Sequence, residues 1–117
     1  MLKVIDKPIL GYEFFTFMEL RAQVHKKYHV THRECIVLSF ITKSYLLGAK
    51  IQVSDILKLE DIASQATLHG VVKLLIKKKL VITKQDPIDG RVKYLSPTPI
   101  SLKIYKEISK DCLKLIC

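Results

Sequence analysis

The residues of this chain that could do chemistry are mainly cations and hydrogen-bonding side chains, and one set of them surrounds a turn. Residues 86–95 read DPIDGRVKYL, with two aspartates, an Asp-Pro step and a glycine before Arg91. The Asp, Pro and Gly are residues that tight turns use. A plain hairpin would not need Arg91, so this segment suggests a binding function as well as a turn.

Positive charge is concentrated in the same part of the chain. The 117 residues include 20 Lys and Arg against 11 Asp and Glu, a formal charge of +9. Residues 64–96 hold seven basic and two acidic residues, whereas residues 31–63 hold four of each. Such clustering predicts a polyanionic partner, most simply nucleic acid. If the lysines only kept a small protein soluble, this would explain the total charge of the chain better than its clustering in residues 64–96.

Catalysis finds little support in these residues. The sequence has no Gly-rich phosphate loop, nucleophile elbow or metal-binding helix motif. His29, His32 and Cys35 recur at intervals of three, but no second pair of metal ligands accompanies them. Cys35 is better interpreted as a small buried hydrophobe. We therefore predict that the chain is not an enzyme and has no metal or cofactor.

Length and composition fit one globular domain spanning residues 1–117, with 49% hydrophobic residues. No apolar run approaches the ~20 residues that span a bilayer, and residues 1–7 lack a signal-peptide pattern. The three cysteines are odd in number and irregular in spacing, which favours a reducing compartment. These features predict a cytoplasmic protein that does not act at a membrane.

Helix signals occupy the first half of the chain. Large apolar residues at helical spacing predict a helix over residues 8–28. Its phenylalanines cannot all face one side, so it is either deeply buried or in contact with another chain. Thr31 and Glu34 form a capping box at the start of a second helix over residues 32–46, which Gly48 ends.

A helix-turn-helix follows. A short helix is expected at residues 53–57, and Ser64 is the expected N-cap of a longer helix that runs to about residue 78. One side of the longer helix is apolar and faces the core. The other side offers small residues, a hydrogen-bonding ring and two cations, namely Ala66, His69, Gly70, Lys73 and Lys77.

Two strands, over residues 80–84 and 92–96, flank the turn at 86–90, and Thr98 caps a last helix that begins at Pro99. The predicted fold is therefore mainly α with a small β-hairpin wing, a winged helix-turn-helix. In that architecture the longer helix enters the DNA major groove. The hairpin tip lies over the backbone or the adjacent minor groove, where negative potential attracts an arginine such as Arg91.

Residues 62–98 resemble the MarR family of transcriptional regulators. Three features carry the resemblance: the run LIKKKLV at the end of the longer helix, the wing pattern Asp86-x-x-Asp89-x-Arg91, and Leu95 and Thr98 after the wing. It extends more weakly into the first two helices. The chain departs from the family pattern at Lys79, where a glycine is common, and at the prolines on either side of Thr98.

The resemblance implies a homodimer in which the terminal helices, about 1–30 and 98–117, form the interface and about 31–96 form the DNA-binding core. The dimer contacts expected on the terminal helices are Phe14, Phe17, Tyr105, Ile108 and Cys112. The resemblance also implies that Arg91 reaches DNA and that Asp86 or Asp89 orients it. A small-molecule effector would enter between the dimer helices and the winged domain, and the sequence does not identify it.

The residues expected to contact double-stranded DNA are Ser64, Gln65, Ala66, Thr67, His69, Gly70, Lys73, Lys77, Arg91 and Lys93. Alternatives stay open for several of them. Thr67 could bond within its own helix, and Arg91 could pair with Asp89 in a solvated turn. Two other functions also stay open: a winged-helix module that binds an acidic protein, and a sensor that responds to cysteine oxidation or to a ligand.

Overall fold

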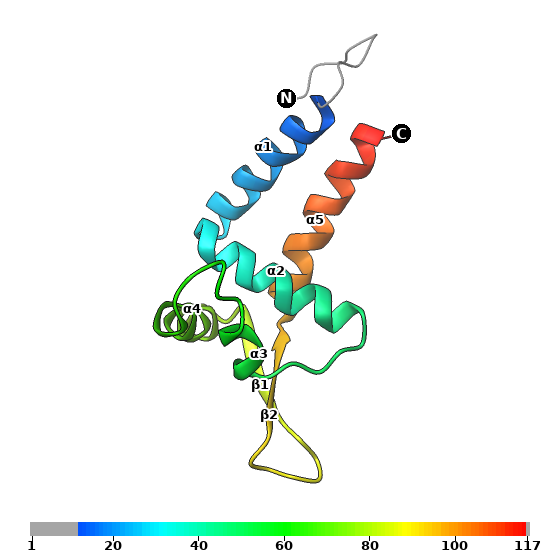
Figure 1. The fold of residues 1–117 in the computed structure, drawn as a ribbon. Helices are drawn as coiled ribbons and strands as arrows, with labels where there is room; N and C mark the ends of the chain where they lie inside the picture. Colours follow the sequence, from blue (N-terminus) through cyan, green and yellow to red (C-terminus); the bar gives the residue numbers. More distant parts are fainter. Residues whose placement is uncertain (1–11, 117) are drawn as a thin grey trace. The chain divides into compact units, whose positions relative to one another are not determined.

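A computed structural model describes residues 12–116 of the chain and the side chains of residues 14–110. The elements follow the predicted order (Figure 1): α1 (Tyr12–Lys27), α2 (His32–Leu46), α3 (Val53–Leu57), α4 (Gln65–Lys77), β1 (Val81–Gln85), β2 (Lys93–Pro97) and α5 (Pro99–Ile116). The predicted start of the first helix at residues 8–11 lies outside the described residues. The chain forms two compact units, Thr31–Lys103 and a second one that contains α1 and the part of α5 from Ile104.

The unit Thr31–Lys103 holds the helix-turn-helix and the wing. Its core is apolar and comes from every element of the unit, with fully buried side chains that include Leu38, Ile41, Ile56, Leu68, Leu75 and Val81. The apolar side of the longer helix, expected to face the core, is buried in α4 at Leu68, Val71, Val72 and Leu75. The winged helix-turn-helix fold, mainly α with a two-stranded hairpin, is confirmed.

The wing is an antiparallel hairpin in which Val81 pairs with Pro97 and Gln85 with Lys93. Both strands lie one residue later than predicted. β1 begins at Val81 because the Leu80 N–H donates to the Leu75 carbonyl at the end of α4. A proline is tolerated at the end of β2, where a missing N–H interrupts little pairing. The N–H of Leu95 donates to the Ile51 carbonyl, and this bond holds the α2–α3 connection against the hairpin.

The helices α1, α2 and α4 all end in the same hydrogen-bonded turn. After each C-cap, one residue has a positive φ, namely His29, Gly48 and Lys79. At the end of α4, Lys79 N–H donates to the Ile76 carbonyl and Leu80 N–H to the Leu75 carbonyl. This pattern is the Schellman motif, in which glycine is the usual residue. Lys79 therefore adopts the backbone conformation of the glycine that it replaces in the family pattern.

The start of α5 is fastened to the turn between α4 and β1. Thr98 accepts the Ser101 N–H as an N-cap and donates its own hydroxyl to the Lys79 carbonyl at 2.8 Å. The buried Ser101 hydroxyl donates to the Leu80 carbonyl. Pro99 occupies the first helical position, where a missing N–H leaves no bond unmade. The predicted N-cap role of Thr98 is thus confirmed.

The second unit joins α1 to α5. Ile104 and Ile108 on α5 are buried, as is Val24 on α1. Glu107 accepts hydrogen bonds from Lys27 Nζ and the Tyr28 hydroxyl, both at 3.1 Å. The bond to Glu107 also raises the pKa of Lys27 above its ordinary value.

Candidate nucleic-acid interface

The first turn of α4 is organised by its N-cap. The hydroxyl of Ser64 accepts the N–H of Thr67 at 3.3 Å and donates to the Thr67 hydroxyl at 3.0 Å. Thr67 therefore does form bonds at its own helix start, which was one of the two alternatives. In these bonds the Thr67 hydroxyl only accepts. Its hydroxyl proton stays available to an outside acceptor. Gln65 and Ala66 beside it are exposed.

The outer side of α4 is open to solvent. Ala66, His69, Lys73 and Lys77 are exposed, and Gly70 is partly exposed. A Cβ placed on Gly70 would meet no atom within 4 Å. Packing therefore does not require glycine here, although glycine inside a helix costs roughly 1 kcal/mol relative to alanine. The missing side chain leaves a low place on the surface beside Lys73.

Asp86 shapes the wing turn. Its carboxylate accepts the backbone N–H of Ile88 at 2.8 Å, the N–H of Asp89 at 3.0 Å and the Tyr94 hydroxyl at 3.0 Å. The bonds from Asp89, Ile88 and Tyr94 lower the pKa of Asp86, so the ionised form holds the turn at neutral pH. The same contact raises the pKa of Tyr94.

Asp89 holds Arg91. Its carboxylate accepts the Arg91 N–H and Nε, both at 3.1 Å, and Nη2 at 3.3 Å. These bonds from Arg91 lower the pKa of Asp89. Between the two candidates, the residue that contacts Arg91 is Asp89, whereas Asp86 builds the turn. The arginine side chain is 92% exposed in this ion pair. Within the described part of the chain, its remaining N–H groups form no hydrogen bond, so they stay available to an outside acceptor.

One ion pair of the helix-turn-helix was not predicted. Lys78 Nζ lies 2.7 and 2.8 Å from the two carboxylate oxygens of the buried Glu34. Glu34 also accepts the Thr31 N–H, which completes the predicted capping box of α2. Burial alone would raise the pKa of Glu34, but the bonds from Lys78 and Thr31 together outweigh it, so the pKa is lowered. This ion pair fixes the start of α2 against the end of α4.

A shallow groove runs between α2 and α4. It is lined by Thr31, the N-cap of α2, by Arg33 from α2 and by Thr67, Gly70 and Lys73 from α4. Arg33 was not among the predicted DNA contacts. It lies on α2, far from α4 in the sequence, and the fold brings it to the groove beside α4. The groove brings a second cation next to Lys73, which suits a phosphate of a bound duplex.

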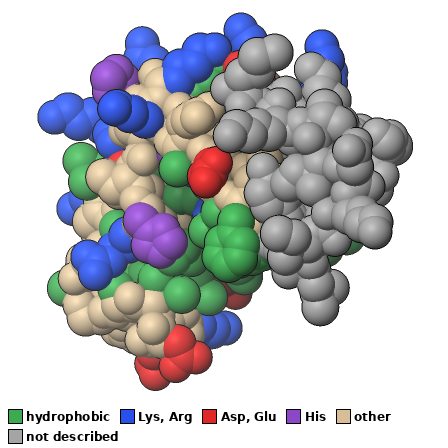
Figure 2. Space-filling view, turned by 90° about the horizontal axis from the view of Figure 1, so that it is seen from above, with side chains coloured by type: hydrophobic (Ala, Val, Ile, Leu, Met, Phe, Trp, Pro, Cys, Tyr) green, Lys and Arg blue, Asp and Glu red, His purple; other side chains and the backbone are tan. Residues whose placement is uncertain are grey.

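Lys93, the other wing cation predicted to contact DNA, is exposed at the start of β2. Basic side chains are not confined to α4 and the wing, however. In the view of Figure 2, Lys and Arg side chains project from much of the rim of the visible face. The total charge therefore supports a polyanionic partner in general, and the location of the interface depends on the geometry of α4 and the wing.

The residues predicted for the dimer interface lie on α1 and α5. Phe14 is 58% exposed, Phe17 and Tyr105 are partly exposed, and Ile108 is buried in its own chain. The side chain of Cys112 lies outside the described residues. Phe15, next to Phe14, is 65% exposed.

The described side chains show no metal site, and the cysteine among them is buried. Cys35 is 1% exposed and its sulfur lies 3.9 Å from the Ser39 hydroxyl, which confirms its interpretation as a buried small side chain. Among the described side chains, no three His, Cys, Asp or Glu residues converge as metal ligands. Within the described part of the chain, no helix combines the length and hydropathy needed to cross a membrane.

Comparisons with known proteins place the fold. No family model and no curated protein sequence matches the chain. Solved structures do: MepR from S. aureus in complex with DNA matches with a TM-score of 0.68 at 19% identity, over 92% of this chain and 80% of that one. The transcriptional regulator Tm0710 from Thermotoga maritima matches with a TM-score of 0.70 at 17% identity, over 92% and 72% of the two chains.

The YusO protein from Bacillus subtilis matches with a TM-score of 0.61 at 20% identity, over 92% and 72% of the two chains. All three of these proteins are MarR-family transcriptional regulators. At such low identities the likeness concerns the fold and does not by itself transfer a function. The resemblance read from residues 62–98 is therefore confirmed as a structural one: the chain has the winged helix fold of MarR-family proteins.

Proposed function

We propose that this protein is a DNA-binding transcriptional regulator of MarR type that acts as a homodimer. The observation that carries the proposal is the outer side of α4, which is exposed, partly basic and low at Gly70, in the same unit as an exposed wing arginine. The solved complex of MepR with DNA, which shares this fold, supports the same partner.

In this proposal α4 enters the major groove, which is wide enough for a helix. Gln65, Thr67 and His69 offer hydrogen-bonding groups near its N-terminal end, where base edges are usually contacted. Lys73 and Lys77 follow on the same side and meet phosphates. Arg33, across the groove from Lys73, adds a further phosphate contact. Phosphate contacts position the protein, and the polar side chains specify the sequence.

The wing contributes Arg91 at the minor groove or the backbone. Asp89 limits the orientations of its guanidinium before DNA is present, so less side-chain entropy is lost on binding. Asp86 keeps the turn in the conformation that presents both residues. The solvated pair of Arg91 and Asp89 is thus the resting state of the DNA-contacting group.

The test is selection of duplexes from a random pool, followed by fluorescence anisotropy with the enriched sequence. We expect a pseudo-palindrome, since a two-fold symmetric dimer reads two half-sites. Arg91→Ala and Lys73→Ala should each weaken binding by roughly 1–3 kcal/mol, which is about five- to 150-fold in Kd.

Lys43→Ala is the matched control, because Lys43 is an exposed lysine of α2 outside the proposed interface. Its affinity should equal that of the wild type. If no sequence is enriched and all three variants bind alike, the protein is not a sequence-specific DNA-binding protein. An acidic protein partner would then be the leading account of the basic surface.

A further inference from the structure

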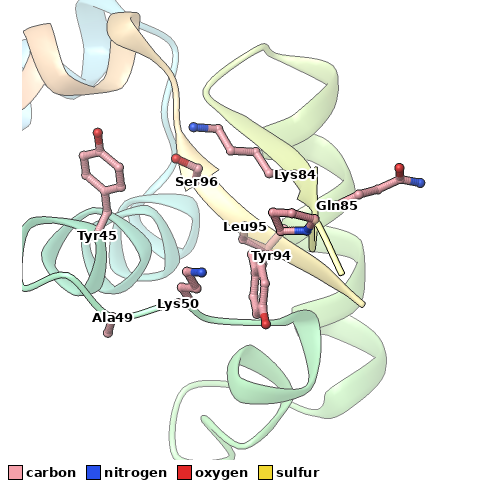
Figure 3. A pocket seen from close by; sticks show the side chains of 9 residues that line it. Tyr45, Ala49, Lys50, Lys84, Gln85, Tyr94, Leu95 and Ser96 are labelled. Atoms are coloured by element: carbon pink, nitrogen blue, oxygen red, sulfur yellow. The ribbon is translucent and has the colours of Figure 1, made fainter. Parts of the chain in front are cut away.

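A hollow of about 300 Å³ lies between the C-terminal end of α2 and the wing (Figure 3). The side chains that matter in it are Tyr45, Lys50, Lys84, Tyr94, Leu95 and Ser96, all in the unit Thr31–Lys103. Its volume lies at the lower end of the ~300–1,000 Å³ typical of small-molecule pockets. None of these residues belongs to the predicted DNA contacts, so DNA binding does not account for the hollow.

The hairpin register creates one wall of the hollow. Lys84 pairs with Tyr94 and Ile82 with Ser96, so Lys84, Tyr94 and Ser96 share one face of the wing. In Figure 3 the Lys84 side chain extends toward Ser96, whereas Gln85 points away from the hollow. The pairing of Leu95 with Ile51 fixes the neighbouring Lys50, whose Nζ lies 5.4 Å from the centre of the Tyr94 ring.

The hollow therefore combines two cations with two aromatic rings. Among the side chains that the structure describes, neither Lys50 nor Lys84 forms an ion pair. Two ammonium groups at one site favour an anion, and the rings of Tyr45 and Tyr94 favour a planar apolar body. This combination suits a ligand that carries both parts in one small molecule.

Phosphate fits this site better than carboxylate. Planar, bidentate recognition of carboxylates is typical of arginine, and the hollow has none. Lysine instead binds phosphate as a compact point charge. A phosphomonoester carries about −1.5 to −2 charge near pH 7, which two lysines balance.

We propose that this hollow is a binding site for a small planar phosphomonoester, with its ring against Tyr45 and Tyr94 and its phosphate between Lys50 and Lys84. The occupied site would adjoin Tyr94, whose hydroxyl bonds to Asp86 of the wing turn. Through Tyr94, the site therefore adjoins the residue that shapes the wing turn.

The test uses the ¹⁵N-labelled chain of 117 residues, without DNA, titrated with phenyl phosphate and followed by amide chemical shifts. Shifts should concentrate at Tyr45, Lys50 and the hairpin positions around Lys84 and Tyr94. Lys50→Gln and Lys84→Gln should each raise Kd at least about tenfold, the effect of losing one charge-assisted contact. Lys43→Gln, an exposed lysine outside the hollow, should leave Kd unchanged. Dispersed amide spectra will show that each variant is folded.

Benzoate and inorganic phosphate separate the two parts of the proposal, and each should bind at least about tenfold more weakly than phenyl phosphate. Benzoate that binds as tightly overturns the assignment to phosphate. The site itself is overturned if the amide shifts spread over lysines throughout the chain. It is also overturned if Lys43→Gln weakens phenyl phosphate binding as much as Lys50→Gln and Lys84→Gln do. Because no DNA is present, these outcomes do not depend on whether the protein binds DNA.

Discussion

At the scale of single residues, several side chains have two bonding roles. Glu34 caps α2 and holds Lys78, and Thr98 caps α5 and holds the Lys79 carbonyl. Asp86 binds two backbone N–H groups and the Tyr94 hydroxyl. Each of these residues fixes one local turn and one longer contact, so their replacement is informative about both.

Glu34→Gln separates the two roles of Glu34. Glutamine can still close a capping box, whereas the charge that pairs with Lys78 is lost. At neutral pH we expect the free energy of unfolding to fall by about 1.5–3 kcal/mol, the range for hydrogen bonds to charged groups. Urea denaturation of the wild type and the variant measures this difference.

The pH dependence of this difference has a defined sign. The pKa of Glu34 is lower in the folded protein, so its contribution is complete above the unfolded pKa, about 4.3. It is lost as the pH falls through the lower, folded pKa. The wild type and Glu34→Gln should therefore converge in stability under acid conditions. A difference that is independent of pH would show that the Glu34–Lys78 pair does not stabilise the fold.

At the scale of elements, the sequence predicted what local chemistry determines. Caps at Thr31, Ser64 and Thr98 fixed the starts of three helices to the residue, and the apolar spacing on α4 predicted its buried side. Both strands begin one residue later than predicted. The Leu80 N–H bonds to the end of α4, and a strand pattern in the sequence gives no sign of that bond.

Contacts between distant segments could not be predicted from one sequence. The pairing of Lys78 with Glu34, the groove that brings Arg33 to Lys73, and the position of Lys50 over Tyr94 each join elements far apart in the chain. Nothing in the local pattern of either partner indicates the other. The choice between Asp86 and Asp89 likewise depended on turn geometry that the spacing alone did not determine.

Gly70→Ala tests whether the outer side of α4 contacts a ligand closely. A Cβ has free space there, so the substitution should stabilise the free protein by about 0.5–1 kcal/mol. Duplex binding should weaken by about tenfold, ~1.4 kcal/mol, since the added methyl group occupies the low surface. Thermal denaturation and anisotropy on the same variant measure the two effects. A stabilised variant that binds DNA as well as the wild type would exclude Gly70 from the interface.

At the scale of the whole molecule, the apolar residues exposed on α1 support the proposed dimer. Sedimentation equilibrium should give about twice the chain mass of 13.4 kDa for the wild type. Phe14→Ser combined with Phe15→Ser should give one chain mass while helical circular dichroism is retained, because both side chains are exposed. A wild type that sediments as a single chain at micromolar concentration would contradict the dimer.

The proposed function depends most directly on phosphate contacts, and the salt dependence of duplex affinity measures them. For the wild type, log K should fall steeply and linearly with log salt concentration, with a slope near −0.9 per neutralised phosphate. Lys73→Ala and Arg91→Ala should each make the slope shallower by about 1 per substituted subunit, and Lys43→Ala should not change it. A slope that is the same in all four proteins would contradict the placement of DNA on α4 and the wing.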